Sequence, residues 1–144
     1  MIKQEISSSC AENNSDFKNQ NFLNARLSVI ICAYNEEKNI EKCLRSLRTD
    51  IYSEEIELIV IDNDSTDNTF AIARKELEFH KNYRLITIDH STLTISRNVG
   101  LELSVSEYVA YIDADGFVDS KYLGQLLQII NNMQPDIISG RVLE

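Results

Sequence analysis

The chain has 144 residues, a hydrophobic content of 43% and a formal net charge of -9 at pH 7. This length favours a single domain, and the hydrophobic fraction is sufficient to build a core. The acidic balance argues against a non-specific nucleic-acid surface or an anionic-membrane surface. The three cysteines have no metal-ligand spacing, so we expect reduced thiols in a cytoplasmic protein.

Residues 1–24 are mainly polar, and we expect them to form a disordered tail ahead of a domain at residues 25–144. Within this stretch Phe17, Phe22 and Leu23 could dock as a short helix. No apolar run reaches transmembrane length, and the N-terminus lacks the apolar core of a signal peptide. Contact with the membrane is therefore expected only as peripheral contact at the inner face.

Short apolar runs rich in β-branched residues predict strands. These runs lie at residues 27–33, 56–61, 83–88 and 108–112, and a fifth strand is predicted to begin within 136–142. Strands that are apolar on both faces are typical of a parallel sheet covered by helices.

Apolar residues spaced three and four apart predict a helix after each of the first four strands. Asn35 is the expected cap of the first helix, which should end near Arg48, and Ser65 or Thr66 is the expected cap of the second. The third covers roughly residues 96–103, where Gly100 is expected to allow close approach to a neighbour or to mark a break. The fourth is capped by Asp119 or Ser120, with Leu123, Leu126, Leu127 and Ile130 facing inward.

Strands and helices alternate through the domain with short connections. This order predicts right-handed βαβ units and therefore an α/β fold with a Rossmann-like parallel sheet flanked by helices.

Two carboxylates one residue apart, Asp113 and Asp115, follow the fourth predicted strand. Charged side chains are costly to bury unless they are paired, and open α/β sheets bind ligands at the carboxyl ends of their strands. Asp-x-Asp at this place is therefore a candidate site for a hard divalent cation with oxygen ligands. Taken alone, the pair could equally lie in a solvated loop or cap the next helix.

Polar residues also follow the first two strands, at residues 34–36 and 62–67. Because parallel strands end at one edge of a sheet, all three loops are expected to form one site. The chemistry suits a nucleoside diphosphate, with an aromatic ring against the base, a carboxylate or amide at base or ribose, and a metal at the phosphates. Without a metal, the repulsion between a carboxylate and a phosphate about 4 Å apart costs about 4 kcal/mol at an effective dielectric constant of about 20. A divalent cation between them is therefore needed.

Four motifs carry a family resemblance: LSVIICAYNE at residues 27–36, VIDNDSTD at 60–67, SRNVG at 96–100 and YIDAD at 111–115. In this order, from about Leu27 to Val142, they resemble the nucleotide-binding half of the family-two glycosyltransferases of GT-A fold. The resemblance implies a UDP-, GDP- or dTDP-linked sugar donor, a divalent Mn or Mg ion, and transfer with inversion at the anomeric carbon.

Position by position, the resemblance also implies a set of site residues. The implied nucleotide-binding residues are Ala33, Tyr34, Glu36, Asp62, Asn63, Arg97 and Asp113. The first three would line the base and ribose pocket, and Arg97 would reach the diphosphate or donor sugar. Asp115 would be the direct metal ligand, with Asp113 beside it at the ribose or at metal-bound water.

The chain departs from the family pattern in two places. Many members have a second Asp and then Gly after the second strand, where this chain has Asn63 and Asp64, so the identity of the base stays open. In the family the acceptor half and its catalytic base follow the fifth strand, and few residues follow Asp115 here. We therefore expect a domain without its acceptor half, no assignable general base, an unknown acceptor, and self-association through an open sheet edge.

Several of these residues have plainer possible roles. Asp67 is expected to be a turn or cap residue, Arg97 could form only a surface ion pair, and His90 is expected to be a loop residue without chemistry.

A second enzymatic interpretation is a haloacid-dehalogenase-like phosphatase, because residues 58–66 resemble its strand followed by Asp-x-Asp-x-Thr. A third is a non-catalytic module that binds a sugar nucleotide or nothing.

Overall fold

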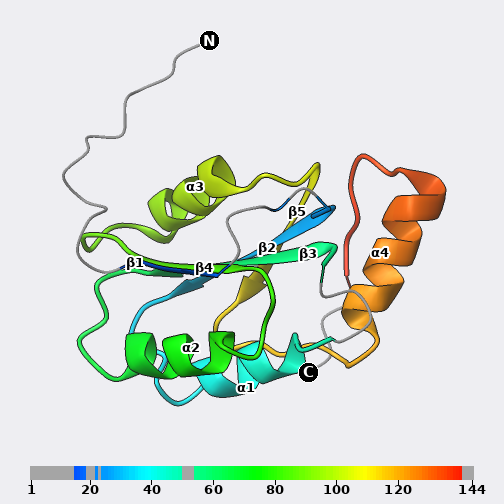
Figure 1. Ribbon diagram of the computed structural model, residues 1–144. Coiled ribbons are helices and arrows are strands. Elements are labelled where there is room, and N and C mark those ends of the chain that lie inside the picture. Colours follow the sequence, from blue (N-terminus) through cyan, green and yellow to red (C-terminus); the bar gives the residue numbers. More distant parts are fainter. Residues whose placement is uncertain (1–14, 19–21, 23, 50–53, 141–144) are drawn as a thin grey trace, which may run out of the picture.

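The computed structural model describes residues 15–18, 22, 24–49 and 54–140. These residues form a single sheet with helices on both faces (Figure 1). The strands are β1 (Ser15–Lys18), β2 (Leu27–Ala33), β3 (Ile56–Asp62), β4 (Tyr83–Thr87) and β5 (Tyr108–Asp113). The helices are α1 (Ile40–Ser46), α2 (Thr69–Leu77), α3 (Leu93–Leu103) and α4 (Tyr122–Met133).

The strand order across the sheet is β1-β4-β3-β2-β5. The strands β2 to β5 are mutually parallel, which confirms the predicted Rossmann-like α/β architecture. Strand β2 lies between β3 and β5, and every residue of β3 is buried. The continuous apolar runs in the sequence arise because helices cover both faces of these central strands.

β1 corrects the prediction of a disordered tail through residue 24. Ser15–Lys18 pairs antiparallel with β4, with Ser15 opposite Ile86 and Lys18 opposite Tyr83. An edge strand is held by hydrogen bonds of its backbone, so a short polar sequence can pair without the apolar run by which strands are predicted. The helix suggested around Phe17 is therefore wrong, and residues 1–14 and Leu23 lie outside the described residues.

Apolar side chains fill both faces of the sheet, and α1, α2 and α4 pack on the larger core. There, Leu44, Leu77 and Leu127 are buried against alternate residues of the strands. The inward face predicted for α4 is confirmed, because Leu123, Leu126, Leu127 and Ile130 are all buried. On the opposite face, α3 covers a smaller cluster formed by Ile30, Ile59, Ile61 and Ile86 (Figure 1).

Gly100 lets the backbone of α3 lie directly against the sheet. A Cβ atom at this position would stand 2.5 Å from Cγ2 of Ile30. Only Ser96 and Gly100 are buried along this helix. The close approach predicted for Gly100 is confirmed, and it fixes the height of α3 above the sheet.

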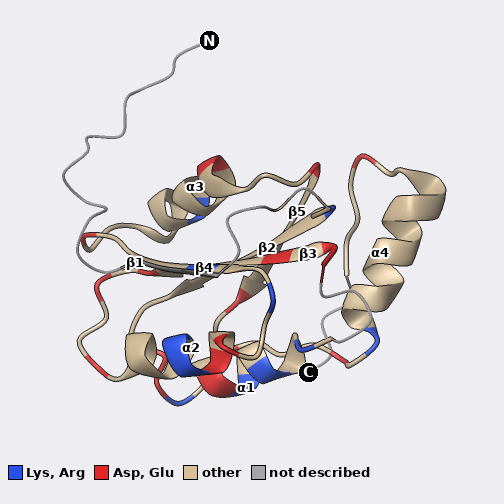
Figure 2. Ribbon diagram, in the orientation of Figure 1, with Lys and Arg blue, Asp and Glu red and all other residues tan. Residues whose placement is uncertain are grey.

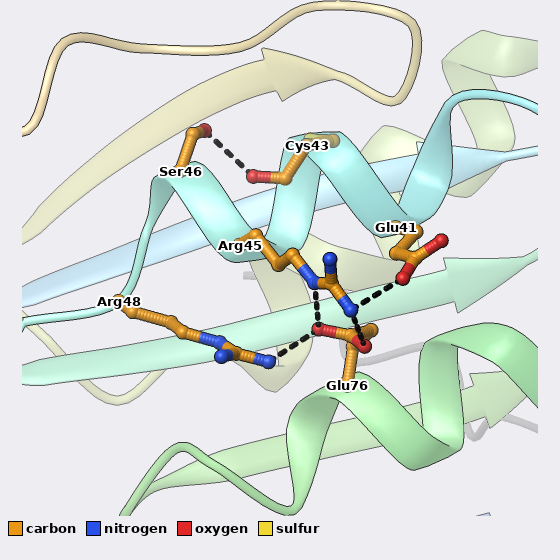
Figure 3. A network of polar contacts seen from close by, with 6 residues as sticks. All are labelled: Glu41, Cys43, Arg45, Ser46, Arg48 and Glu76. Carbon is orange, nitrogen blue, oxygen red and sulfur yellow. Dashed lines mark hydrogen bonds and ion pairs between the residues drawn. The ribbon is translucent and has the colours of Figure 1, made fainter.

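A buried carboxylate joins α1 to α2 (Figure 3). Glu76 is 2% exposed and accepts a hydrogen bond from Arg48 at 2.5 Å and one from Arg45 at 3.3 Å. Arg45 also pairs with Glu41 one turn earlier on α1. Two guanidinium groups compensate the desolvation of one carboxylate, and the two helices are thereby fixed as one layer.

The predicted caps of α1, α2 and α4 are wrong, and the N-cap of α4 is Lys121, not Asp119 or Ser120. Asn35 does not cap α1, which begins at Ile40; instead Asn35 adopts a left-handed conformation with φ 54°. Neither Ser65 nor Thr66 caps α2, which begins at Thr69. Asn35, Ser65 and Thr66 instead form hydrogen bonds between the loops after β2 and β3. Local capping patterns do not predict such bonds, because the partners are distant in sequence.

The predicted fifth strand is also wrong within residues 136–140, which adopt no strand; residues 141–142 lie outside the described part. Helix α4 ends at Gln134, whose left-handed φ of 45° and the following Pro135 redirect the chain. A hollow of about 750 Å³ separates this segment from β5, and Ile137 is 87% exposed. Among the described residues, β5 is therefore one edge strand of the sheet, and β1 is the other.

Acidic and basic side chains intermix along α1 and α2, whereas α4 carries none (Figure 2). Within the described ranges, none of the helices is both long and apolar enough to cross a bilayer.

Candidate functional site

Three strands end side by side at the edge where the predicted site lies. Ala33 is in register with Asp62 on β3, and Cys32 is in register with Asp113 on β5. The loops that follow β2, β3 and β5 therefore leave the sheet at the same level. Carboxyl ends of neighbouring parallel strands are where α/β proteins bind ligands.

The loops after β2 and β3 are bonded to each other. The Asn35 N–H donates to Oγ of Ser65 at 3.0 Å, and the Thr66 N–H donates to Oδ1 of Asn35 at 2.8 Å. The Glu36 N–H donates to Oγ1 of Thr69 at 2.7 Å. These bonds hold Glu36 and the residues beside it against the start of α2.

Asp67 serves the structure of these loops. Its carboxylate accepts hydrogen bonds from the N–H and hydroxyl of Thr69 and from the N–H of Glu37. It therefore satisfies free donors at the start of α2 and in the turn before α1. The prediction that Asp67 is a turn and cap residue is confirmed.

Asp62 is a buried carboxylate with an incomplete set of partners. It is 3% exposed, its Oδ2 accepts from the Ser65 N–H at 3.4 Å, and its Oδ1 has no hydrogen-bond partner. Burial raises the pKa of Asp62 above its ordinary value of 3.8, and the neighbouring carboxylates of Asp64 and Asp67 raise it further. Such a group is costly in the free protein and becomes favourable when a donor reaches it.

Asn63 is engaged with the protein itself. Its Nδ2 donates to the carbonyl of Ser91 at 2.8 Å, and its Oδ1 accepts from the N–H and hydroxyl of Ser91 at 2.9 and 3.1 Å. The side chain is buried. Asn63 thus ties the loop after β4 to the end of β3, which is a different role from the base contact predicted for it.

Tyr34 lies against His90, a contact that sequence reasoning missed. The ring centroids are 4.7 Å apart and the rings are tilted by 49°. Tyr34 is 46% exposed, so part of its ring stays open to solvent. A single loop histidine gives no signal in the sequence, because its neighbour comes from a different strand end.

Asp113 forms an ion pair with Arg97 of α3. The distance from Nη2 of Arg97 to Oδ1 of Asp113 is 2.9 Å, and the two side chains are 40% and 69% exposed. Arg97 also lies 5.7 Å from the ring centre of Tyr111. The pairing leaves Oδ2 of Asp113 available and brings a guanidinium group to the acidic end of β5.

The thiol of Cys43, on α1, is buried near the end of β5. Burial, followed by the charges of Asp115, Asp113 and Glu36, raises the pKa of Cys43 to about 12. The Cys43 thiol also lies 3.7 Å from the backbone carbonyl of Asp113. This raised pKa keeps the thiol protonated at neutral pH.

The oxygen ligands at the end of β5 suit a hard cation that is shared with a ligand. Asp113 and Asp115 are exposed, and the described ranges contain no group of three or more His, Cys, Asp or Glu able to hold a metal by itself. Magnesium is commonly bound by one or two carboxylates together with substrate phosphates. Asp113 and Asp115 fit a shared site of this kind, in which the phosphates of the ligand complete the coordination of the ion.

Comparison with known proteins agrees with this geometry. The family described as glycosyl transferase family 2 matches residues 28–144. Glycosyltransferase GlyA of Streptococcus pneumoniae is 31% identical over 115 residues, which cover 80% of this chain and 16% of that protein. Glycosyltransferase AglE of Haloferax volcanii is 32% identical over 118 residues, covering 81% of this chain and 39% of the relative. The chain thus spans well under half the length of these relatives.

The fold is also similar to that of solved glycosyltransferase structures. Residues 1–349 of S. aureus TarS in complex with UDP superpose with a TM-score of 0.73 at 28% identity, covering 83% of this chain and 38% of TarS. The mannosyltransferase PcManGT of Pyrobaculum calidifontis, in complex with GDP-Man and Mn2+, gives 0.67 at 26% identity, covering 75% and 33%. These similarities confirm the GT-A type of fold.

Proposed function

The chain belongs to glycosyl transferase family 2, and we propose that it binds a nucleotide-diphosphate sugar through a divalent Mn or Mg ion for inverting transfer of the sugar. The observation that carries the proposal is the convergence at one sheet edge of an open aromatic ring, a buried unpaired carboxylate and an exposed acid pair. Binding of UDP by TarS and of GDP-Man with Mn2+ by PcManGT supports it.

Each side chain has a chemical task in this proposal. The base lies on the open surface of Tyr34, and a base or ribose donor reaches the unpaired Oδ1 of Asp62, where it relieves an unmet acceptor. Ala33 and Glu36, which flank Tyr34 in the sequence, would contact the base or ribose. Arg97 would lie beside the diphosphate. Its guanidinium group would bond the phosphate oxygens, either while it stays paired with Asp113 or after that ion pair breaks.

Asp115 and Asp113 would hold the ion, and the diphosphate would supply the remaining oxygen ligands. A bound divalent ion supplies Lewis-acid stabilisation of charge on the departing diphosphate. It also reverses the repulsion between the donor and an acidic protein. Inverting transfer further needs a base within hydrogen-bond reach of the acceptor hydroxyl, and no residue is assigned to that step.

The experiment is calorimetric titration of UDP, GDP and dTDP in Mn²⁺ and in chelator. We expect measurable binding of at least one nucleotide only with the metal, and loss of that dependence in Asp115→Ala. Asp119→Ala, an exposed acid whose carboxylate bonds the Lys121 N–H, is the matched control. Equal affinity in metal and in chelator would contradict the metal-dependent site.

Two activity assays beside the titration separate the alternatives. Nucleotide binding without turnover of the UDP-, GDP- or dTDP-sugar would favour a binding module, whereas hydrolysis of a chromogenic phosphate would favour the phosphatase. Family membership argues against the phosphatase. The position of Asp62 also argues against it, because Asp62 ends β3, whereas the nucleophile of such phosphatases is expected on the first strand.

A further inference from the structure

We propose that His90 is a positioning residue for the nucleobase, whose imidazole fixes the orientation of the Tyr34 ring on which the base stacks. This inference rests on the proposed function and deepens it. It assigns a role to a residue for which the sequence predicts none.

The ring contact joins two loops that face each other across the sheet edge. Tyr34 follows β2 and His90 follows β4, and their centroids are 4.7 Å apart with a tilt of 49°. This separation lies within the range of favourable aromatic pairs. Because Tyr34 stays 46% exposed, the contact restrains the ring while leaving part of its surface open to a base.

The loop that carries His90 is itself fixed from β3. The Ile88 N–H donates to the backbone carbonyl of Asp62 at 3.0 Å, and Ser91 makes three hydrogen bonds with the buried side chain of Asn63. His90 lies between these two anchored residues. Asn63 therefore holds the loop that carries His90, and the imidazole contacts Tyr34 from a fixed backbone position.

A purely structural role would bury the pair, and here both side chains are exposed. An exposed contact contributes little to the stability of the fold, whereas restraint of Tyr34 before binding removes part of the entropic cost of ordering it around a base. The benefit of the pair is therefore expected in nucleotide affinity and not in the free energy of unfolding.

The test compares UDP and pyrophosphate binding in Mn²⁺ for the unaltered chain, His90→Ala and His90→Phe. His90→Ala should weaken UDP binding roughly two- to tenfold, from the usual strength of an aromatic pair. Pyrophosphate has no base, so its affinity should stay unchanged. His90→Phe should restore UDP affinity to within roughly twofold, because it keeps a flat ring against Tyr34.

Phe79→Ala is the matched control, since it removes an exposed ring that contacts Arg48 away from the strand ends. It should leave both affinities unchanged. Unchanged UDP affinity in His90→Ala, or an equal loss in His90→Phe, would overturn the positioning role while leaving the proposed function intact. Failure of the unaltered chain to bind UDP, GDP or dTDP would overturn the proposed function and this inference together.

Discussion

The loops after β2, β3 and β4 differ from the loop after β5 in how their functional side chains are held. In the first group, side chains bond across loops, as in the pairs Asn63 with Ser91 and Tyr34 with His90. In the β5 loop the backbone is anchored, with the Val118 N–H bonded to Oγ of Ser46, but the carboxylates of Asp113 and Asp115 face solvent.

This difference matches what each region would bind. A base is a flat, neutral shape, so the protein gains by ordering its contact surface before the base arrives. A cation and a diphosphate bring their own charge and ligands, so two accessible carboxylates suffice until they bind. Substitutions in the β5 loop should therefore change binding alone, whereas substitutions of the buried polar side chains Asp62 and Asn63 after β3 should also change stability.

The largest effect is expected from Asp113→Ala. Removal of a ligand of the acid pair should lower UDP affinity in Mn²⁺ about 100-fold, judged from the 10–100-fold effects of groups that only support metal ligands. The ion pair with Arg97 is exposed, so the free energy of unfolding should change by less than about 1 kcal/mol. Calorimetry and urea unfolding measure both. A large loss of stability with unchanged affinity would remove the contrast between the two regions.

Tyr34→Ala should be next in size. Loss of stacking should weaken UDP binding by about 1–3 kcal/mol, which corresponds to about 5- to 150-fold. Tyr34→Phe keeps the ring and should bind normally. Pyrophosphate affinity, measured by the same titration, should not change in either variant. If it falls with UDP affinity, the base does not lie on Tyr34.

Asn63→Ala tests whether the ordered loops contribute to stability. It removes three hydrogen bonds and leaves polar groups of Ser91 without their partner, so the free energy of unfolding should fall by about 1–3 kcal/mol. Urea denaturation gives the value. Asn131→Ala, at an exposed amide on α4, should change stability by less than about 0.5 kcal/mol. Equal free energies of unfolding for the two variants would show that the hydrogen bonds between Asn63 and Ser91 do not stabilise the fold.

Asp62→Asn should change stability less than Asn63→Ala does, and with the opposite sign. The folded state raises the pKa of Asp62, so the ionised carboxylate is disfavoured on folding and its removal should stabilise the free protein by about 1 kcal/mol at pH 7. The advantage of the variant should shrink as the pH falls through the raised folded-state pKa, because the native carboxyl then becomes neutral as well.

Thermal unfolding at pH 7 and pH 5 measures the effect of Asp62→Asn on stability, and titration with UDP measures its cost in binding. A variant that is less stable at pH 7, or that binds UDP as tightly as the unaltered chain, would show that Asp62 is not held ready for a ligand.

Much of the fold follows from local pattern. β-Branched apolar runs predicted the strands at 27–33, 56–61 and 108–112 to within one residue, because central strands covered by helices are mostly apolar along their whole length. The alternation of strands and helices then predicted the parallel sheet. The acid pair Asp113 and Asp115 was found by the same route, since acids directly after an apolar strand have no packing role. The roles of Ala33, Tyr34, Glu36 and Arg97 came from the family resemblance.

The tertiary structure decided what depends on partners distant in sequence. Backbone pairing with β4 makes Ser15–Lys18 a strand, and redirection of the chain at Gln134 keeps 136–140 from becoming one. The amide of Asn63 and the ring of His90 acquire their roles only because β3 and β4 are neighbours, which brings Ser91 and Tyr34 within reach. Residue type and spacing along the chain fix periodicity and burial, whereas hydrogen-bond partners depend on which strand ends meet.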